Sequence, residues 1–238
     1  MIVLKKVLNA IADILFPKHC AGCGELLDTS DDFCDYCFEM LSKTDCDSLC
    51  EKCGCGKKEC QCKYHVFHFS AAAAPYYNEG PAKKAMYDFK FRGKLYFAEF
   101  FAEKMALTVI NKFHSIKFDA IAYVPIPLKR ELKRGYNQSR ELAIRIAKIL
   151  ELPLAEKAIG CNEKKQIQHE TDFKYRFENV KGKYYPNISL KGKTVLLVDD
   201  IKTTGATLDE CTKALLKAGA LEVYCITGLI TKRKKEGR

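Results

Sequence analysis

The sequence has no apolar run long enough to cross a lipid bilayer, and composition typical of disorder is confined to its last few residues. The part after residue 65 also has no internal repeat. These absences argue against a membrane-spanning and a disordered protein. Apolar residues make up 47% of the 238 residues, which is enough for a buried core. A length of this order accommodates one medium domain and one small module.

The first segment, residues 1–17, has no small-residue cleavage site after it, which argues against a signal peptide. Asn9 and Asp13 make the segment too polar to span a membrane. Its apolar residues recur at helical spacing on one face: Leu4, Leu8, Ile11 and Leu15. We therefore predict an amphipathic helix that packs on the protein, with peripheral membrane contact as the alternative.

Cysteine is scarce after residue 62 and dense before it. Ten of the 13 cysteines lie between Cys20 and Cys62. Such a cluster indicates either disulfides, which need an oxidising compartment, or bound metal. Because we expect no secretion signal, we predict a cytoplasmic protein, and the cytoplasm favours metal.

Two Cys-x2-Cys pairs, Cys20/Cys23 and Cys34/Cys37, are ten residues apart. A tight turn of this spacing lets two thiolates bind one ion, and Gly24 after the first pair suits such a turn. The pairs predict a structural zinc site, because four protein ligands leave no position open for water. A redox-active dithiol is the alternative.

A second zinc site is predicted from Cys50, Cys53, Cys60 and Cys62. Its second half is irregular, because only one residue separates Cys60 from Cys62. Cys46, Cys55 and His65 are therefore possible substitute ligands.

The net charge of +10 is unevenly distributed. Residues 1–65 carry 8 Lys/Arg and 11 Asp/Glu, a net charge of −3, whereas the remainder carries 32 and 19, a net charge of +13. A basic domain suits an anionic partner such as a phosphate or a nucleic-acid backbone, although a solvated basic surface explains the charge equally well.

Apolar runs after residue 65 alternate with helical patterns. We expect strands at 65–77 (one or two), 119–124, 154–159, 195–198 and 223–230. We expect helices at 81–91, 95–113, 138–150 and 207–218. Residues 161–191 are polar and weakly periodic, which predicts a long loop with one hairpin. Alternating strands and helices predict an α/β domain with a parallel sheet.

Residues 195–207, VLLVDDIKTTGAT, combine an apolar strand with two acids and a small-residue loop. In open α/β sheets, ligands bind beyond the carboxyl ends of the strands, where Asp199 and Asp200 are expected. The following loop and the helix N-terminus suit a phosphate. Thr207 has a second explanation, because Thr207-x-x-Glu210 is a capping-box pattern.

A second polar block lies between the strand at 119–124 and the helix at 138–150. It contains three cations, Arg130, Lys133 and Arg134. Cations beside a strand end suit a diphosphate, and ordinary surface charge is the alternative.

Residues 195–207 resemble the signature of type I phosphoribosyltransferases. The block from Val124 to Gln138 resembles the VPVP…R…RGFNQ block of ComF/GntX-like proteins, with Tyr136 in place of Phe. The resemblance covers nearly the whole chain. It implies an amphipathic helix (1–17), a double zinc ribbon (18–65) and a Rossmann-like, parallel-sheet phosphoribosyltransferase domain (66–238).

The resemblance also implies residue roles for a phosphoribosyl diphosphate (PRPP) site with Mg²⁺. Asp199 and Asp200 would hold the ribose hydroxyls, Arg130 and Arg134 the departing diphosphate, and Lys90 would face the ligand. The loop holding the 5′-phosphate would consist of Thr203, Thr204, Gly205, Ala206 and Thr207. Lys202 departs from the signature, in which this position is usually uncharged. Its ammonium would either help to bind the phosphate or point into solvent. The segment 161–191 corresponds to the mobile catalytic loop.

Two hypotheses follow for the function. The first is a phosphoribosyltransferase whose acceptor no residue identifies. ComF-type proteins are associated with natural competence, so the second is a factor that senses PRPP or binds single-stranded DNA without turnover. Competence-machinery proteins are then expected partners.

Overall fold

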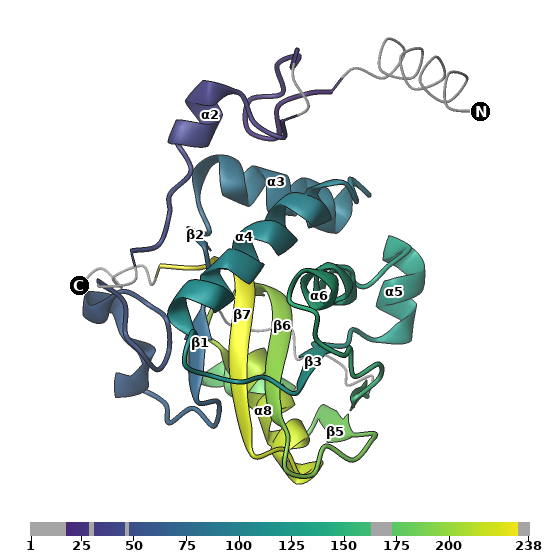
Figure 1. The fold of residues 1–238 in the computed structure, drawn as a ribbon. Coiled ribbons are helices and arrows are strands. Elements are labelled where there is room, and N and C mark those ends of the chain that lie inside the picture. Colours follow the sequence, from purple (N-terminus) through teal and green to yellow (C-terminus); the bar gives the residue numbers. More distant parts are fainter. Residues whose placement is uncertain (1–17, 29–30, 46–47, 163–172, 233–238) are drawn as a thin grey trace.

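The computed structural model describes residues 18–28, 31–45, 48–162 and 173–232 (Figure 1). At its centre lies a parallel, five-stranded sheet in the order β1-β7-β6-β3, with β2 pairing farther along β7. Its strands are β1 (Ala71–Ala73), β2 (Tyr76–Tyr77), β3 (Ala120–Tyr123), β6 (Thr194–Lys202) and β7 (Glu222–Ile230). The predicted α/β fold class is confirmed.

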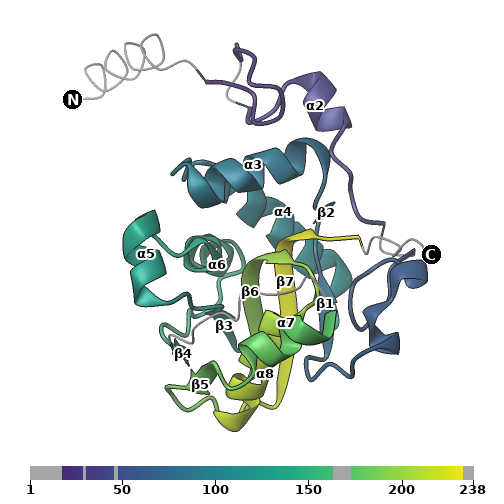
Figure 2. The ribbon, with the colours of Figure 1, turned by 180° about the vertical axis from the view of Figure 1, so that it is seen from behind.

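Helices cover both faces of this sheet, as parallel strands require. One face carries α3 (Gly80–Phe91), α4 (Phe97–Lys112) and α6 (Gln138–Ile149) (Figure 1). The other carries α8 (Ala206–Lys217), on which α7 (Phe173–Val180) packs (Figure 2). Among the described residues, no helix combines the length and the apolar character needed to cross a membrane.

Strand β6 explains why the central run of the sequence is continuously apolar. Leu196 and Val198 belong to the buried cluster under α4 and α6, whereas Val195 and Leu197 belong to the cluster under α8. Since successive side chains of a strand point to opposite faces, both parities must be apolar when both faces are covered.

Several short elements complete the described chain. Helix α5 (Leu128–Arg134) follows β3, and β4 (Ile159–Cys161) pairs antiparallel with β5 (Tyr184–Pro186). The cysteine-rich part contains α2 (Asp35–Glu39) and the 3-10 turns η2 (Lys57–Glu59) and η3 (Gln61–Lys63). Two of these elements were not expected: α7 lies in the segment 161–191 that the sequence predicted as a loop, and α5 lies in a block to which the sequence analysis assigned no helix or strand.

The two cysteine-rich segments pack on different faces. Cys37 and Phe33 of the first share the cluster of α3 and α4, and the Phe33 and Phe100 ring centroids are 5.0 Å apart. Cys53 and Phe67 of the second share the cluster of α8. The predicted helix at 1–17 lies outside the described residues, as does the 163–172 part of the predicted catalytic loop.

Candidate functional site

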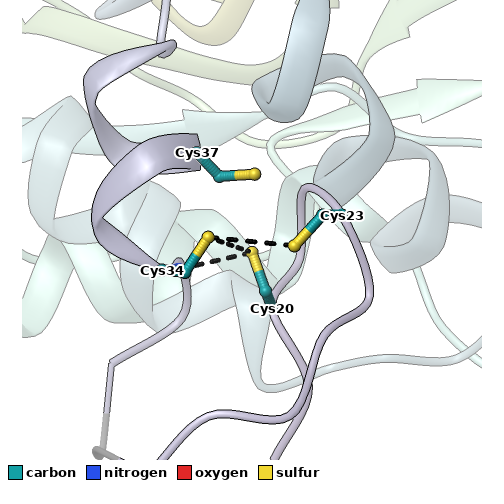
Figure 3. A group of neighbouring side chains, drawn as sticks. All are labelled: Cys20, Cys23, Cys34 and Cys37. Carbon is teal, nitrogen blue, oxygen red and sulfur yellow. Dashed lines mark hydrogen bonds between the residues drawn. The ribbon is translucent and has the colours of Figure 1, made fainter.

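The first cysteine group brings four thiols together, as Figure 3 shows. The sulfurs of Cys20, Cys23, Cys34 and Cys37 all lie within 4.8 Å of one another. The Sγ of Cys20 accepts hydrogen bonds from the N–H groups of Gly22 and Cys34 at 3.4 and 3.3 Å. This grouping confirms the sequence prediction of a four-thiol cluster.

The second group consists of Cys50, Cys53, Cys60 and Cys62, again within 4.8 Å. Gly54 has a φ of +69°, and a Cβ there would lie 2.4 Å from the Ala72 carbonyl oxygen. Only glycine therefore allows this turn to approach β1. The irregular Cys60-x-Cys62 spacing nevertheless closes a tetrad.

The predicted substitutes lie elsewhere or outside the described part. Cys55 accepts a hydrogen bond from Lys202, and His65 pairs with Asp209. Cys46 lies outside the described residues. A tetrad of sulfurs is the donor set that tetrahedral Zn²⁺ prefers, so both groups are compatible with closed, structural zinc sites.

The acid pair lies inside β6 rather than after it, because the strand continues to Lys202. The Asp199 Oδ1 accepts a hydrogen bond from the Ser139 hydroxyl at 2.7 Å, and the Asp200 Oδ2 lies 2.5 Å from the Lys90 Nζ. Lys90 thus contacts the acid pair; the sequence analysis predicted that it would face the ligand. Ser139, in the first turn of α6, was not found from the sequence.

Burial, followed by the charge of Asp200, raises the pKa of the Asp199 carboxyl to about 7. The Lys90 charge and the hydrogen bonds from Ser139 and the Asp200 N–H act in the opposite direction. The pair therefore holds less than its full negative charge near neutral pH.

Helix α5 brings two arginines to the same side of the sheet. The Arg134 Nη1 donates to the Gln138 Oε1 at 3.1 Å, and the Arg134 guanidinium lies 4.9 Å from the Phe91 ring centroid. Burial, and next to it the charge of Arg130, lowers the Arg134 pKa from its usual value. The two cations thus repel each other until an anion lies between them.

The turn after α5 is fixed by Asn137. Its Oδ1 accepts from the N–H groups of Ser139 and Arg140, which caps α6, and its Nδ2 donates to the Val124 carbonyl at 3.1 Å. This one side chain therefore joins the end of β3 to the start of α6.

The small-residue loop 203–207 runs into α8, because Gly205, with a φ of 81°, forms the N-cap of that helix. The capping-box interpretation of Thr207 is therefore wrong, because the helix begins before it. The carboxylate of Glu210 instead accepts from the Gly182 N–H and from Lys213. Thr207 instead lines the hollow that also contains Asp199 and Asp200.

Lys202 does not point into solvent. It is only 2% exposed, and its ammonium donates to the Gln61 Oε1 at 2.6 Å and to the Cys55 Sγ at 3.3 Å. Lys202 also lines a small hollow together with the loop residues Thr204, Gly205 and Ala206. Gln61, which was not singled out from the sequence, also donates to the Thr203 carbonyl at 2.7 Å.

A hollow of about 320 Å³ lies at this end of the sheet. It brings together most of the predicted site residues: Lys90, Arg130, Arg134, Asp199, Asp200, Thr203 and Thr207. The remaining loop residues, Thr204, Gly205 and Ala206, line an adjoining hollow of about 20 Å³. Lys133 does not line either, although the sequence grouped it with the arginines.

A larger hollow, of about 680 Å³, lies between α7, α8 and the end of the second cysteine group. It is lined by aromatic rings and by three lysines: Tyr64, His65, Phe177, Tyr184, Lys181, Lys213 and Lys217, with Glu178 and Glu210 beside them. Tyr184 lines both this hollow and the 320 Å³ one. No sequence signal pointed to this site, because its residues come from three separate segments.

The raised Asp199 pKa has a consequence for stability. Between its ordinary value of 3.8 and about 7, the folded chain binds more protons at this group than the unfolded chain does. The free energy of unfolding therefore falls as pH rises through this range. We expect Asp199→Asn to make this fall shallower in urea-unfolding titrations. Asp119→Asn, at an exposed carboxyl, is the control, and equal slopes in both variants would contradict the assignment.

Comparison with known proteins agrees with the geometry. Residues 136–238 match the family model described as phosphoribosyl transferase domain. The chain is 26% identical over 207 residues to DNA utilization protein YhgH of Escherichia coli (strain K12), covering 81% of this chain and 88% of that protein. It is 30% identical over 142 residues to Competence protein F of Haemophilus influenzae, covering 57% and 62%.

A further relative is Competence protein ComFC of Bacillus subtilis (strain 168), 30% identical over 137 residues, covering 58% of this chain and 54% of that protein. Among solved structures, a glutamine phosphoribosylpyrophosphate amidotransferase from B. subtilis gives a TM-score of 0.41 at 17% identity, covering 60% and 30%. A purine phosphoribosyltransferase from Pyrococcus horikoshii Ot3 gives 0.34 at 20%, covering 58% and 92%. Residues 136–238 therefore match a phosphoribosyl transferase domain, and the chain is similar to proteins named as competence and DNA utilization proteins.

Proposed function

We propose that the 320 Å³ hollow binds a phosphoribosyl diphosphate together with Mg²⁺ and that the chain transfers its phosphoribosyl group. The observation that carries the proposal is the meeting of three polar groups at one strand end. These are the acid pair of β6, the arginines of α5 and the loop 203–207. Carboxylates suit ribose hydroxyls, and guanidinium groups suit a diphosphate.

The residues divide the ligand between them. Asp199 and Asp200 accept hydrogen bonds from the ribose hydroxyls, and the loop 203–207 with the N-terminus of α8 receives the 5′-phosphate. Arg130 and Arg134 stabilise the charge of the departing diphosphate. Mg²⁺, a hard cation that prefers oxygen ligands, would supply further charge neutralisation when bound with the substrate. The Lys90 ammonium, 2.5 Å from the Asp200 carboxylate, offsets part of the negative charge of the acid pair before the ligand binds.

Calorimetric titration with PRPP and Mg²⁺ tests the binding step. We expect Asp200→Asn to weaken binding at least about tenfold, because a hydrogen bond to a charged group contributes about 1.5–3 kcal/mol. Arg130→Ala should weaken it similarly. Lys133→Ala is the matched control, because Lys133 lies on the same helix and does not line the hollow. Equal effects of the two α5 substitutions would contradict the assignment.

Measuring the release of diphosphate distinguishes a transferase from a protein that only senses PRPP. The transferase proposal requires Mg²⁺-dependent release of diphosphate in a screen of amines and nucleobases, and its loss in Asp200→Asn. Tight binding without release from any acceptor would favour the sensing alternative.

We propose that both cysteine tetrads hold zinc, in the cytoplasm, where thiols stay reduced. The proposal is supported by four sulfurs within 4.8 Å in each group. Metal analysis of the purified chain should give two zinc ions. Cys23→Ser should remove one from the first tetrad and Cys60→Ser one from the second. Zinc below one per chain in the unaltered protein would contradict the proposal.

A second candidate function is binding of single-stranded DNA in the service of DNA uptake. Relatives are named as competence and DNA utilization proteins. The 680 Å³ hollow combines aromatic rings with lysines. Proteins that bind single-stranded nucleic acid combine aromatic rings, on which the bases stack, with cations that contact the backbone.

This candidate predicts affinity for an oligothymidine that falls steeply as salt rises. Lys217→Ala, in the hollow, should reduce both the affinity and the salt slope in fluorescence anisotropy. Lys117→Ala, outside the hollow, should leave them unchanged. Absence of binding at about 50 mM salt would exclude the function, since electrostatic affinity is strong at that concentration.

A further inference from the structure

The second cysteine group lies directly behind the phosphate loop. Gln61 is the one residue between Cys60 and Cys62, and it is only 3% exposed. Its Nε2 donates to the Thr203 carbonyl at 2.7 Å, and its Oε1 accepts from the Lys202 ammonium at 2.6 Å. The Gln61 side-chain amide thus acts as a donor to Thr203 and as an acceptor from Lys202, at the start of the loop.

The hydrogen bond to Thr203 fixes the orientation of a peptide group. Because a trans peptide directs its C=O and N–H to opposite sides, holding the Thr203 carbonyl toward Gln61 turns the Thr204 N–H away from it. Gly205 is held from the same side: a Cβ there would lie 3.0 Å from the Phe67 ring and 3.1 Å from the Lys202 Cε. The loop is therefore supported at two points by the same cysteine-rich segment.

A third contact extends this support into α8. The Asp209 carboxylate, fully buried in the first turn, accepts from the His68 N–H at 2.6 Å and lies 3.0 Å from the His65 Nε2. The segment following Cys62 thus also fixes the helix whose N-terminus closes the loop.

Lys202 is a buried ammonium whose hydrogen-bond partners within the described chain are an amide oxygen and a thiol. Burial of a cation is costly unless negative charge lies nearby. Four thiolates around one Zn²⁺ carry a surplus of negative charge, and Cys55, which Lys202 contacts, is two residues from Cys53. Four cysteine thiolates holding a metal at the second tetrad would supply the negative charge that Lys202 needs.

We propose that Gln61 and Lys202 are positioning residues that couple metal binding at the second tetrad to sugar-phosphate binding at the loop 203–207. The short Cys60-x-Cys62 spacing holds Gln61 by a metal ligand on each side, so loss of the ion releases the loop. This coupling rests on the proposed function for its ligand. It is reciprocal by thermodynamic necessity, so the sugar phosphate also stabilises the metal.

The first experiment measures PRPP binding with Mg²⁺ by calorimetry and zinc content by metal analysis. Gln61→Ala should weaken binding about tenfold, the effect of leaving a buried carbonyl without its donor. Zinc should stay at the unaltered value, since no ligand changes. Gln61→Glu keeps the acceptor for Lys202 and loses the donor to Thr203, so it should weaken binding too. Lys63→Ala, exposed on the same 3-10 turn, is the matched control.

Reciprocity supplies a readout that a merely structural role would not alter. In equilibrium competition with a chromophoric chelator, PRPP with Mg²⁺ should tighten the affinity for one of the two zinc ions about tenfold in the unaltered chain. In Gln61→Ala this gain in zinc affinity should disappear. An equal gain in both proteins would overturn the coupling.

Hydrogen exchange distinguishes failure of the coupling from failure of the proposed function. If the unaltered chain does not bind PRPP, the proposed function fails, but the loop amides still report the coupling. Cys60→Ser should raise exchange at residues 203–207 about tenfold, as loss of one buried hydrogen bond predicts, whereas Cys23→Ser at the first tetrad should not. Gln61→Ala must reproduce the effect with both metals bound; unchanged exchange there would overturn the proposal.

Discussion

Burial of β6 on both faces is the constraint on which the rest of the structure depends. Val195 to Val198 are enclosed by α4 and α6 on one side and by α8 on the other. A strand enclosed in this way can place polar side chains only where the covering helices end. Asp199 and Asp200 lie at that point, and the chain then turns into the loop and the N-terminus of α8. The site is therefore a consequence of how the core is closed.

The cysteine-rich part is divided between the two faces of the same sheet. The first tetrad packs with Phe33 against the helices of one face, and the second packs with Phe67 against the other. Within the described residues, only the second segment contacts the loop 203–207, through Gln61. Two chemically similar tetrads thus have different positions relative to the site, which the repeated Cys-x2-Cys pattern does not distinguish.

The sequence predicted those features that a local pattern of residues encodes. The apolar run of β6 identifies a doubly covered strand, and the cysteine spacing identifies both tetrads, because each signal lies within a few neighbouring residues. Contacts between distant segments were beyond it. Ser139 and Asp199 are 60 residues apart, and Gln61 and Thr203 are 142 apart. Only the folded chain brings them together.

Two irregularities in the sequence explain each other once the fold is known. Lys202 is a charged residue at a position that is usually uncharged, and Cys60-x-Cys62 is shorter than the usual spacing. The two features contact each other through Gln61, which lies between the two cysteines and accepts a hydrogen bond from Lys202. Helices α5 and α7 were missed for another reason. Each is short, at 7 and 8 residues, and depends on its neighbours more than on its own periodicity.

Tyr184 lines both the 320 Å³ hollow and the 680 Å³ hollow. Burial raises the pKa of its phenol, so the hydroxyl keeps its proton and can donate a hydrogen bond to an anion on either side. A shared wall also means that the two volumes are not independent. A ligand that moves this ring in one hollow would therefore also change the shape of the other.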